Sequence, residues 1–412
     1  MGKKSLLPDE LKIEILLGLS IKSLLRFKSV CKDWHILIES ATFANRYSDI
    51  SHAKNSNKLI CFHRNPDQVD VVSLIDRQTV EKIIDLEWPP FVDEGIDNKE
   101  EYERFINILG PVNGIYCIFS RLLYRWVGTL TLWNPATREY KHIAPPVSFP
   151  FSFDLFSERW HDHWYYERAY ARGLHIGFGF DKKVNDFKAV VICHWEAFYD
   201  LGGGYGNWHV KMYNLSSDSW RTLYYIKSDE AVLFEGIDPF FHLYSFPDYV
   251  HCYLKGVFHW STDEYDILGF NVTTESFELI KGPPVTKYKY NCKSAWVLNE
   301  KIAMVFIPLE DIMHPCGAVV WIMMEYGMEE SWTMLHSIGP VLGLTIIGIP
   351  NDHQIFFSNQ NGQLLSFDFE DQVFKDSDIY GLRKPDLNFP YYCGSQGVLN
   401  YVETFVPLKH VH

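Results

Sequence analysis

The stretch 160–164, Trp-His-Asp-His-Trp, holds the densest cluster of side chains that could bind a metal. A His-x-His pair can ligate zinc, which usually needs further protein ligands to complete its site. No Cys or His pair elsewhere has a spacing that would supply them, and the eight cysteines form no C-x-x-C motif. We therefore expect neither a metal site nor any other cofactor.

Three glycine-bearing stretches imitate motifs of nucleotide binding or nucleophilic catalysis. The stretch 177–182 carries two glycines of a dinucleotide loop, but Lys182 stands where the third belongs and a β-hairpin pattern follows. The stretch 202–206 lacks the Gly-Lys-Ser/Thr ending of a P-loop. The stretch 394–397 is one residue short of a nucleophile elbow. The sequence therefore predicts no catalytic residue, and we expect a protein that is not an enzyme.

Two stretches rich in aromatic and acidic side chains, 149–170 and 234–249, are better candidates for a binding site. Aromatic side chains concentrate at the energetic centres of protein interfaces. The alternative is that they only cover the core of the domain around them. The side chains expected to contact a target protein are Trp160, Trp164, Tyr165, Tyr166, Phe234, Glu235, Asp238, Phe240, Phe241 and Asp248.

Three short helical patterns occupy residues 6–43, ahead of these stretches. Pro8 opens the first pattern, acidic residues follow it where a helix N-terminus favours negative charge, and Ser20 can cap the second. The apolar residues that recur with helical spacing are Leu11, Ile15, Leu16 and Leu19, then Leu24, Leu25 and Phe27, then Val30, Trp34, Leu37 and Ile38.

A helical piece of this size cannot bury enough apolar surface to be stable alone. Its apolar stripes need a second surface, which is either the rest of this chain or another protein. The spacing alone leaves both readings open. We expect Leu7, Pro8, Ile15 and Trp34 to have no partner within the chain.

The same residues resemble an F-box, specifically the plant type. The match runs through Leu7-Pro8, Ile15-Leu16, 22–28, 30–34 and 37–38, with Ser20 where many plant members carry Pro. The resemblance implies that this module binds a Skp-type adaptor and, through it, a cullin-RING ubiquitin ligase. It implies as adaptor-binding residues Leu7, Pro8, Leu11, Ile15, Leu16, Leu19, Leu24, Leu25, Phe27, Val30, Cys31, Trp34, Leu37 and Ile38.

From residue 58 onward, short β-rich runs replace the helical periodicity. Six stretches read as an apolar strand, a polar turn and a second strand, and a further hairpin-like piece precedes most of them. A recurring unit of about four strands predicts a β-propeller-like domain with about six blades. The six stretches are 70–84, 129–143, 210–223, 267–280, 319–335 and 364–374.

The alternative fold is a pair of β-sandwiches, since residues 58–412 exceed what one sandwich core normally supports. We expect a small all-α module at 1–45, a linker at 46–57 and the all-β domain at 58–412. The alternating stretch 401–408 predicts a last strand that closes the ring beside the first blade, near 69–84.

The β-rich segments also resemble the plant F-box-associated domain, in the order of that family, from about residue 110 to the end. The stretches 184–190, 324–332 and 401–407 are most similar to its S-locus F-box group. Members of that group act in pollen self-incompatibility and target secreted ribonucleases, the S-RNases. Other members of the family have other targets, such as a defence or signalling protein. A scaffold that takes no part in a ligase is the remaining alternative.

The net charge of −14 is unevenly distributed along the chain. Residues 1–50 hold eight Lys and Arg against six Asp and Glu, which leaves 30 against 46, or −16, for the remainder. This acidity argues against nucleic acid, whose phosphates need neutralisation, and favours a basic protein partner, although a merely solubilising surface explains it as well. No apolar run is long enough to cross a membrane, so we expect the protein in the cytosol, with the nucleus as a second compartment.

Overall fold

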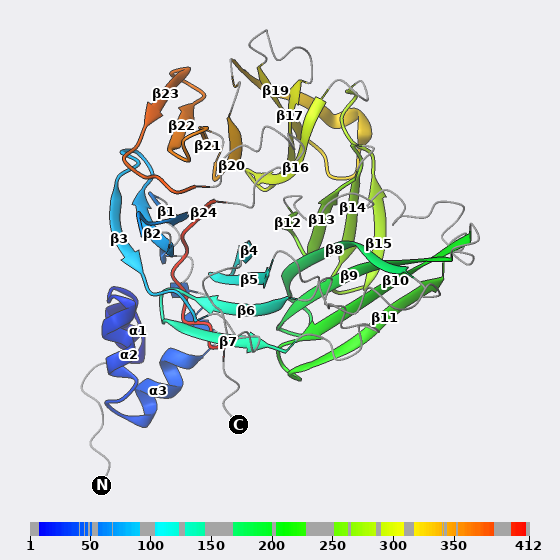
Figure 1. The fold of residues 1–412 in the computed structure, drawn as a ribbon. Helices are drawn as coiled ribbons and strands as arrows, with labels where there is room; N and C mark the ends of the chain where they lie inside the picture. The colour runs from blue at the N-terminus through cyan, green and yellow to red at the C-terminus, as the bar shows by residue number, and fades with distance from the viewer. Residues whose placement is uncertain are drawn as a thin grey trace.

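In the computed structural model, helices precede the sheets, and three of these helices have both ends within the described residues (Figure 1). They are α1 (Asp9–Leu17), α2 (Ile21–Phe27) and α3 (Lys32–Glu39). Pro8 directly precedes α1, and the Ser20 hydroxyl accepts a hydrogen bond from the Ser23 N–H at 3.4 Å, so the predicted cap of α2 is confirmed. The structure describes residues 8–90 except 41, 45, 48, 49, 52–56 and 68; 104–122; 128–144; 168–199; 203–227; 251–308 except 263, 264 and 286–289; 317–382 except 340, 342, 343 and 352; and 397–408.

Helical residues continue beyond the predicted end of the module. Residues 42–44, 46, 47, 50 and 51 are helical, and Tyr47 and Ser51 are buried. The predicted linker, 46–57, therefore includes helical residues at 46, 47, 50 and 51. Phe43, Tyr47 and Ile50 follow one another at helical spacing, and this short stripe is the signal that would have extended the module.

Six four-stranded antiparallel sheets follow the helices. The first sheet contains β1 (Lys58–Arg64), β2 (Asp70–Asp76), β3 (Lys82–Leu86) and β24 (Val398–Asn400). The second contains β4 (Arg104–Val112), β5 (Ile115–Leu122), β6 (Thr129–Asn134) and β7 (Glu139–Ile143). The third contains β8 (Arg168–Asp181), β9 (Asp186–Tyr199), β10 (Gly203–Asn214) and β11 (Ser219–Lys227).

The remaining three sheets repeat the same up-and-down order. The fourth contains β12 (His251–Leu254), β13 (Val257–Ser261), β14 (Ile267–Asn271) and β15 (Ser276–Ile280). The fifth contains β16 (Tyr290–Leu298), β17 (Lys301–Pro308), β18 (Ala318–Met323) and β19 (Trp332–Ile338), with a 3₁₀ turn, η3 (Glu329–Ser331), before β19. The sixth contains β20 (Thr345–Gly348), β21 (Gln354–Ser358), β22 (Leu364–Asp368) and β23 (Val373–Asp376).

Each of the six predicted repeats is the third and fourth strand of one sheet. Local turn chemistry explains why they could be predicted. In four of these hairpins, the side chain of an Asn or Asp at the end of the third strand accepts hydrogen bonds from the N–H groups two and three residues later, which fixes the turn. Those residues are Asp76, Asn134, Asn271 and Asp368.

The sheets close into a ring, which makes the domain a six-bladed β-propeller (Figure 1). The first strands of neighbouring sheets lie together at the centre, where β24 is next to β4, β4 next to β8, β8 next to β12 and β12 next to β16. Six separate apolar clusters fill the spaces between neighbouring sheets. One of them, which contains Leu59 and Phe356, joins the sixth sheet to the first. A pair of sandwiches would have two cores instead, so that alternative is wrong.

The ring closes between the two ends of the β-domain, as predicted, but the closing strand differs from the expectation. It is β24, and it pairs with β1, so that Leu59 faces Asn400. The stretch 401–408 forms no strand. Its backbone carbonyls accept hydrogen bonds from a side chain instead of a neighbouring strand: the Asn134 amide donates to Thr404 and Val406 at 3.1 and 3.2 Å.

One face of the ring carries the helices. In an up-and-down sheet, the first-to-second and third-to-fourth turns lie at the same edge. The helical module enters the first sheet at this edge, at Lys58, and the tail that follows Asn400 crosses the equivalent turns of the second sheet, where it meets Gly114 and Asn134. We call this side of the ring the helix-side face.

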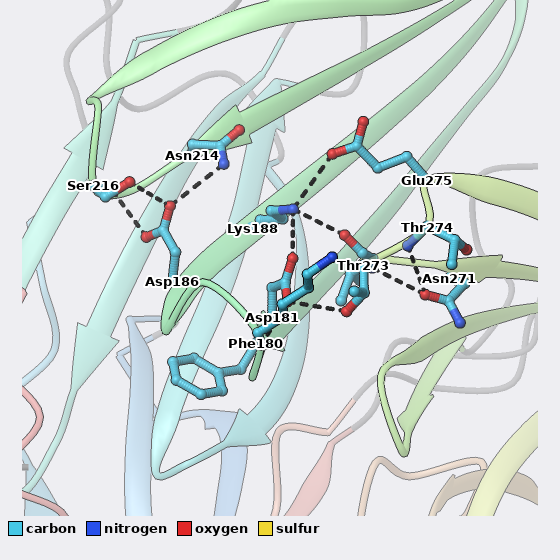
Figure 2. Close-up of polar contacts among 12 residues, drawn as sticks. Phe180, Asp181, Asp186, Lys188, Asn214, Ser216, Asn271, Thr273, Thr274 and Glu275 are labelled. Atoms are coloured by element: carbon cyan, nitrogen blue, oxygen red, sulfur yellow. Dashed lines mark hydrogen bonds and ion pairs between the residues drawn. The ribbon is translucent and has the colours of Figure 1, made fainter.

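A buried ion pair joins the third and fourth sheets at this face (Figure 2). Lys188 Nζ, on β9, lies 2.8 Å from the Asp181 carboxylate and donates to the Val272 carbonyl, in the β14–β15 turn, at 2.9 Å. Both charged side chains are at most 5% exposed. Asp181 also accepts from the Lys183 N–H and the Thr273 hydroxyl. Burial alone would raise the pKa of Asp181, but these hydrogen bonds outweigh it and lower the pKa.

Candidate functional site

The helical module has its own small core, and part of the predicted adaptor-binding set belongs to it. Leu16, Leu24 and Ile38 are at most 2% exposed and pack with Leu17, Ile21 and Phe43. These three predicted residues shape the module from inside and present no surface to a partner in this structure.

A second group of predicted residues is half-buried against that core. It includes Trp34, whose ring packs edge-on against Phe27 at 5.0 Å between ring centres. The expectation that Trp34 has no partner within the chain is therefore wrong, because α2 and α3 are joined by a short turn that brings the two rings together. The group consists of Leu19, Leu25, Phe27, Trp34 and Leu37.

The remaining described members of the set face solvent. Leu11 and Ile15, one turn apart on α1, are 51% and 56% exposed, and Val30, between α2 and α3, is 61% exposed. Pro8 and Cys31 are also exposed, and Leu7 lies outside the described residues. Large apolar side chains gathered on so small a module indicate a surface that another protein covers.

Ile36, on α3, is a further exposed apolar residue that the sequence-based set lacks; it is 68% exposed. The signal was present in the run Ile36-Leu37-Ile38, since three successive residues of a helix cannot all face one core. Ile38 takes the core position, so Ile36 is directed elsewhere.

The helical module also packs against its own chain, at the C-terminal tail that follows the last strand of the ring. The Phe405 ring lies 4.8 Å from Tyr47 and 6.3 Å from Phe43, and all three side chains are buried. The Tyr47 hydroxyl also lies 3.4 Å from the Glu403 carboxylate, and burial together with that charge raises the pKa of Tyr47. The reading in which the stripes pack on the rest of the chain is therefore confirmed for one side of the module, while another side remains exposed.

The ten side chains predicted to contact a target all lie outside the described residues. The strands that bracket them are described. β7 ends at Ile143 and β8 begins at Arg168, while β11 ends at Lys227 and β12 begins at His251. These are fourth-to-first connections, so by the antiparallel rule the bracketing strand ends lie at the face opposite the helix-side face.

Ser73, His63 and Asp85 lie together and are the residue types of a Ser-His-Asp catalytic triad, but their hydrogen bonds do not follow the order of a triad. The Ser73 hydroxyl donates to Asp85 at 2.6 Å and lies 2.8 Å from His63 Nε2. In a Ser-His-Asp triad the carboxylate orients the histidine, and the serine is accessible to substrate. Here Ser73 contacts the carboxylate directly and is fully buried, so the three residues join β1, β2 and β3 as a structural network.

The glycines of the stretch 177–182 have a packing role. Gly177 and Gly179 lie on β8 against aromatic side chains of the fourth sheet, and a Cβ on Gly179 would stand 2.3 Å from the Tyr253 ring. In the described ranges, no group of three or more His, Cys, Asp or Glu side chains is placed to hold a metal ion. None of the described helices is long and apolar enough to cross a membrane.

Comparison with known proteins finds two family matches, one on the helical module and one on most of the β-propeller. Residues 5–45 match the F-box domain, and residues 98–404 match the F-box associated beta propeller domain. An F-box/kelch-repeat protein of Arabidopsis thaliana is 23% identical over 347 residues, which cover 81% of this chain and 79% of that protein. An F-box protein of the same plant is 24% identical over 291 residues, covering 68% of this chain and 61% of the relative.

Proposed function

The chain belongs to the F-box associated beta propeller family and carries an F-box domain ahead of its ring, and on this premise we propose that it is the substrate-recognition subunit of an SCF-type ubiquitin ligase. In this role the helices bind a Skp-type adaptor and, through it, a cullin-RING complex, while the propeller binds a target protein. The chain supplies proximity between the target and the ubiquitin-loaded enzyme and performs no bond chemistry itself.

The observation that carries this proposal is the division of the helical module into two sides. One side is fixed to the ring through Tyr47 and Phe405, while Leu11, Ile15, Val30 and Ile36 remain more than half exposed. A module that only packed within the chain would have no reason to expose four large apolar side chains. A module that joins the propeller of its own chain to another protein needs both surfaces.

A finer proposal concerns the target. We propose a basic target protein, because residues 51–412 carry a net charge of −16 and opposite charge speeds association. The similarity of stretches such as 184–190 to the S-locus group supports a secreted ribonuclease as that target, in pollen. A target unrelated to self-incompatibility is the alternative. For either target, we place the protein in the cytosol, with the nucleus as a second compartment.

The target proposal is tested by surface plasmon resonance with a basic ribonuclease at two salt concentrations. Screening over about 8–10 Å should slow association steeply as salt rises. Trp160→Ala or Trp164→Ala should instead raise the dissociation rate, since aromatic contacts act mainly there. An association rate that does not change with salt concentration, or no binding to any ribonuclease allele, would contradict a basic ribonuclease as the target.

The ligase proposal itself is tested by a pull-down from plant extract with the whole tagged chain. A substrate receptor recovers both the Skp-type adaptor and the cullin. A scaffold that uses only its propeller recovers neither, and that result would replace the ligase role by a simple binding role.

A further inference from the structure

The β18–β19 hairpin of the fifth sheet exposes an unusual number of apolar side chains. Within residues 324–335, five large apolar side chains are between 39% and 53% exposed. We call these residues the methionine surface, and they are Met324, Tyr326, Met328, Met334 and Leu335. Single exposed apolar residues are ordinary, but several within one hairpin indicate a surface that binds another protein.

Acidic residues lie within the same hairpin. Glu325, Glu329 and Glu330 are all exposed, and none of them forms an ion pair within the described part of the chain. Two lysines lie near the hairpin. Lys301 Nζ is 3.5 Å from Met324 Sδ. Lys281, whose carbonyl accepts from Trp332, pairs with Asp266 at 2.7 Å. Carboxylates beside flexible thioether side chains favour a ligand that combines apolar groups with positive charge.

The hairpin backbone is held in one conformation. The Ser331 hydroxyl lies 2.7 Å from the Met328 carbonyl and accepts from the Glu325 N–H at 3.1 Å. Gly327 occupies a left-handed conformation, with φ of 77°, at the tip of the turn. A rigid backbone lowers the ordering cost that binding would otherwise incur, while the methionine side chains keep the adaptability that a new contact needs.

The fourth sheet anchors the hairpin from below. The Tyr326 hydroxyl donates to Glu278 at 2.6 Å and lies 3.0 Å from Nε2 of the buried His259. The Trp332 indole N–H donates to the Lys281 carbonyl at 2.8 Å. These bonds attach both ends of the turn to the fourth sheet, so the methionine surface has a fixed position on the propeller.

The position of the hairpin leaves it accessible while the helices are occupied. Its turn joins a third to a fourth strand and therefore lies at the helix-side face. The helical module packs near the turn of the second sheet at Ala136, and the fifth sheet is three sheets further round the ring (Figure 1). A partner bound to Leu11 and Ile15 therefore leaves the methionine surface uncovered on the far side of the ring.

We propose that the methionine surface is a second protein-docking site, which binds a partner segment that presents apolar side chains together with Lys or Arg. The strands that bracket the stretches 149–170 and 234–249 end at the opposite face, so this partner can be bound together with a target held there. A second copy of this chain does not fit, because it would bring like charges against one another.

The test uses the whole chain with ¹³C-labelled methionine methyl groups and two synthetic peptides of equal length, one of alternating Leu and Lys and the other of alternating Leu and Glu. The Leu-Lys peptide should shift the methyl signals of Met324, Met328 and Met334. The signals of the buried Met212 and Met304, which lie in other strands, are internal references. The Leu-Glu peptide should bind about tenfold more weakly.

Charge reversal supplies the matched control. Glu325→Lys/Glu329→Lys/Glu330→Lys should weaken binding of the Leu-Lys peptide about tenfold. Asp67→Lys/Glu81→Lys/Asp371→Lys makes the same charge change at exposed positions of other sheets and should leave binding at the methionine surface nearly unchanged. Equal binding of both peptides, equal effects of the two triple variants, or no methyl shift at the three residues would overturn the proposal. Co-purification of the Skp-type adaptor, measured in parallel, reports separately on the ligase role.

Discussion

Replacement of Lys188 by Met tests how the third and fourth sheets are joined. The substitution keeps the apolar length of the side chain and removes the cation that pairs with Asp181 at 2.8 Å, within a site at most 5% exposed. It also removes the donor to the Val272 carbonyl of the neighbouring sheet. Breaking a buried pair from one side leaves an uncompensated charge, so we expect a loss of about 3–5 kcal/mol in the free energy of unfolding at pH 7.

The loss should depend on pH in a defined direction. In the wild-type chain the pKa of Asp181 is lowered, so its contribution to stability is present above the unfolded pKa of about 3.9 and is lost as the pH falls through the folded value. In Lys188→Met the bonds from the Lys183 N–H and the Thr273 hydroxyl remain but the cation is gone, so the pKa of Asp181 is higher than in the wild-type chain and the buried carboxyl takes up its proton at a higher pH. The difference in stability between the two proteins should therefore shrink from pH 7 to about pH 4.

The assay is urea denaturation followed by tryptophan fluorescence at both pH values. Asp181→Asn/Lys188→Met is the matched control, because it removes both charges and should recover much of the lost stability. A Lys188→Met chain within about 1 kcal/mol of wild type at pH 7, or a loss that is the same at pH 4, would refute this account of the junction.

Three further changes test other parts of the fold. Removal of residues 397–412 deletes β24 and exposes the edge of β1, so the chain should aggregate in size-exclusion chromatography; a monomer with the wild-type melting temperature would contradict the closure. Phe405→Ala should cost about 3–5 kcal/mol and speed amide hydrogen exchange in α1–α3, whereas unchanged exchange would mean that the tail does not hold the module. Gly179→Ala should destabilise the ring by about 1–3 kcal/mol because its Cβ meets Tyr253 at 2.3 Å, while Gly339→Ala, whose nearest contact is 3.5 Å, should melt close to wild type.

The parts of the fold that could be predicted are those that neighbouring residues determine. The outer hairpin of every sheet has alternating apolar residues and, in four of the six, an Asn or Asp such as Asp76 or Asn271 that closes its own turn. The alternation repeats six times along the chain, each time within one short stretch. These signals therefore predicted the repeated unit, and with it the propeller.

Contacts between distant residues could not be predicted in the same way. Tyr47 contacts Phe405, more than three hundred residues later in the chain, and no pattern of residue spacing predicts that contact. The tail 401–408 alternates like a strand, yet Asn134 and the second sheet bind it as an irregular segment. Within the candidate site, helical spacing identified the apolar residues of the module but could not separate the buried Leu16 from the exposed Ile15, since that depends on how the helices pack against one another.

The central claim is that the exposed side of the helical module binds a Skp-type adaptor, and the affinity of the purified chain for that adaptor tests it most directly. Burial of Leu11 and Ile15 should supply about 1.5–3 kcal/mol each, so Leu11→Asp/Ile15→Asp should weaken binding by about a hundredfold or more. Ile83→Asp/Ile84→Asp, a pair equally exposed on β3, should bind as the wild type does. An adaptor that binds the Leu11 and Ile15 variant with wild-type affinity, or that does not bind the wild-type chain, would contradict the claim.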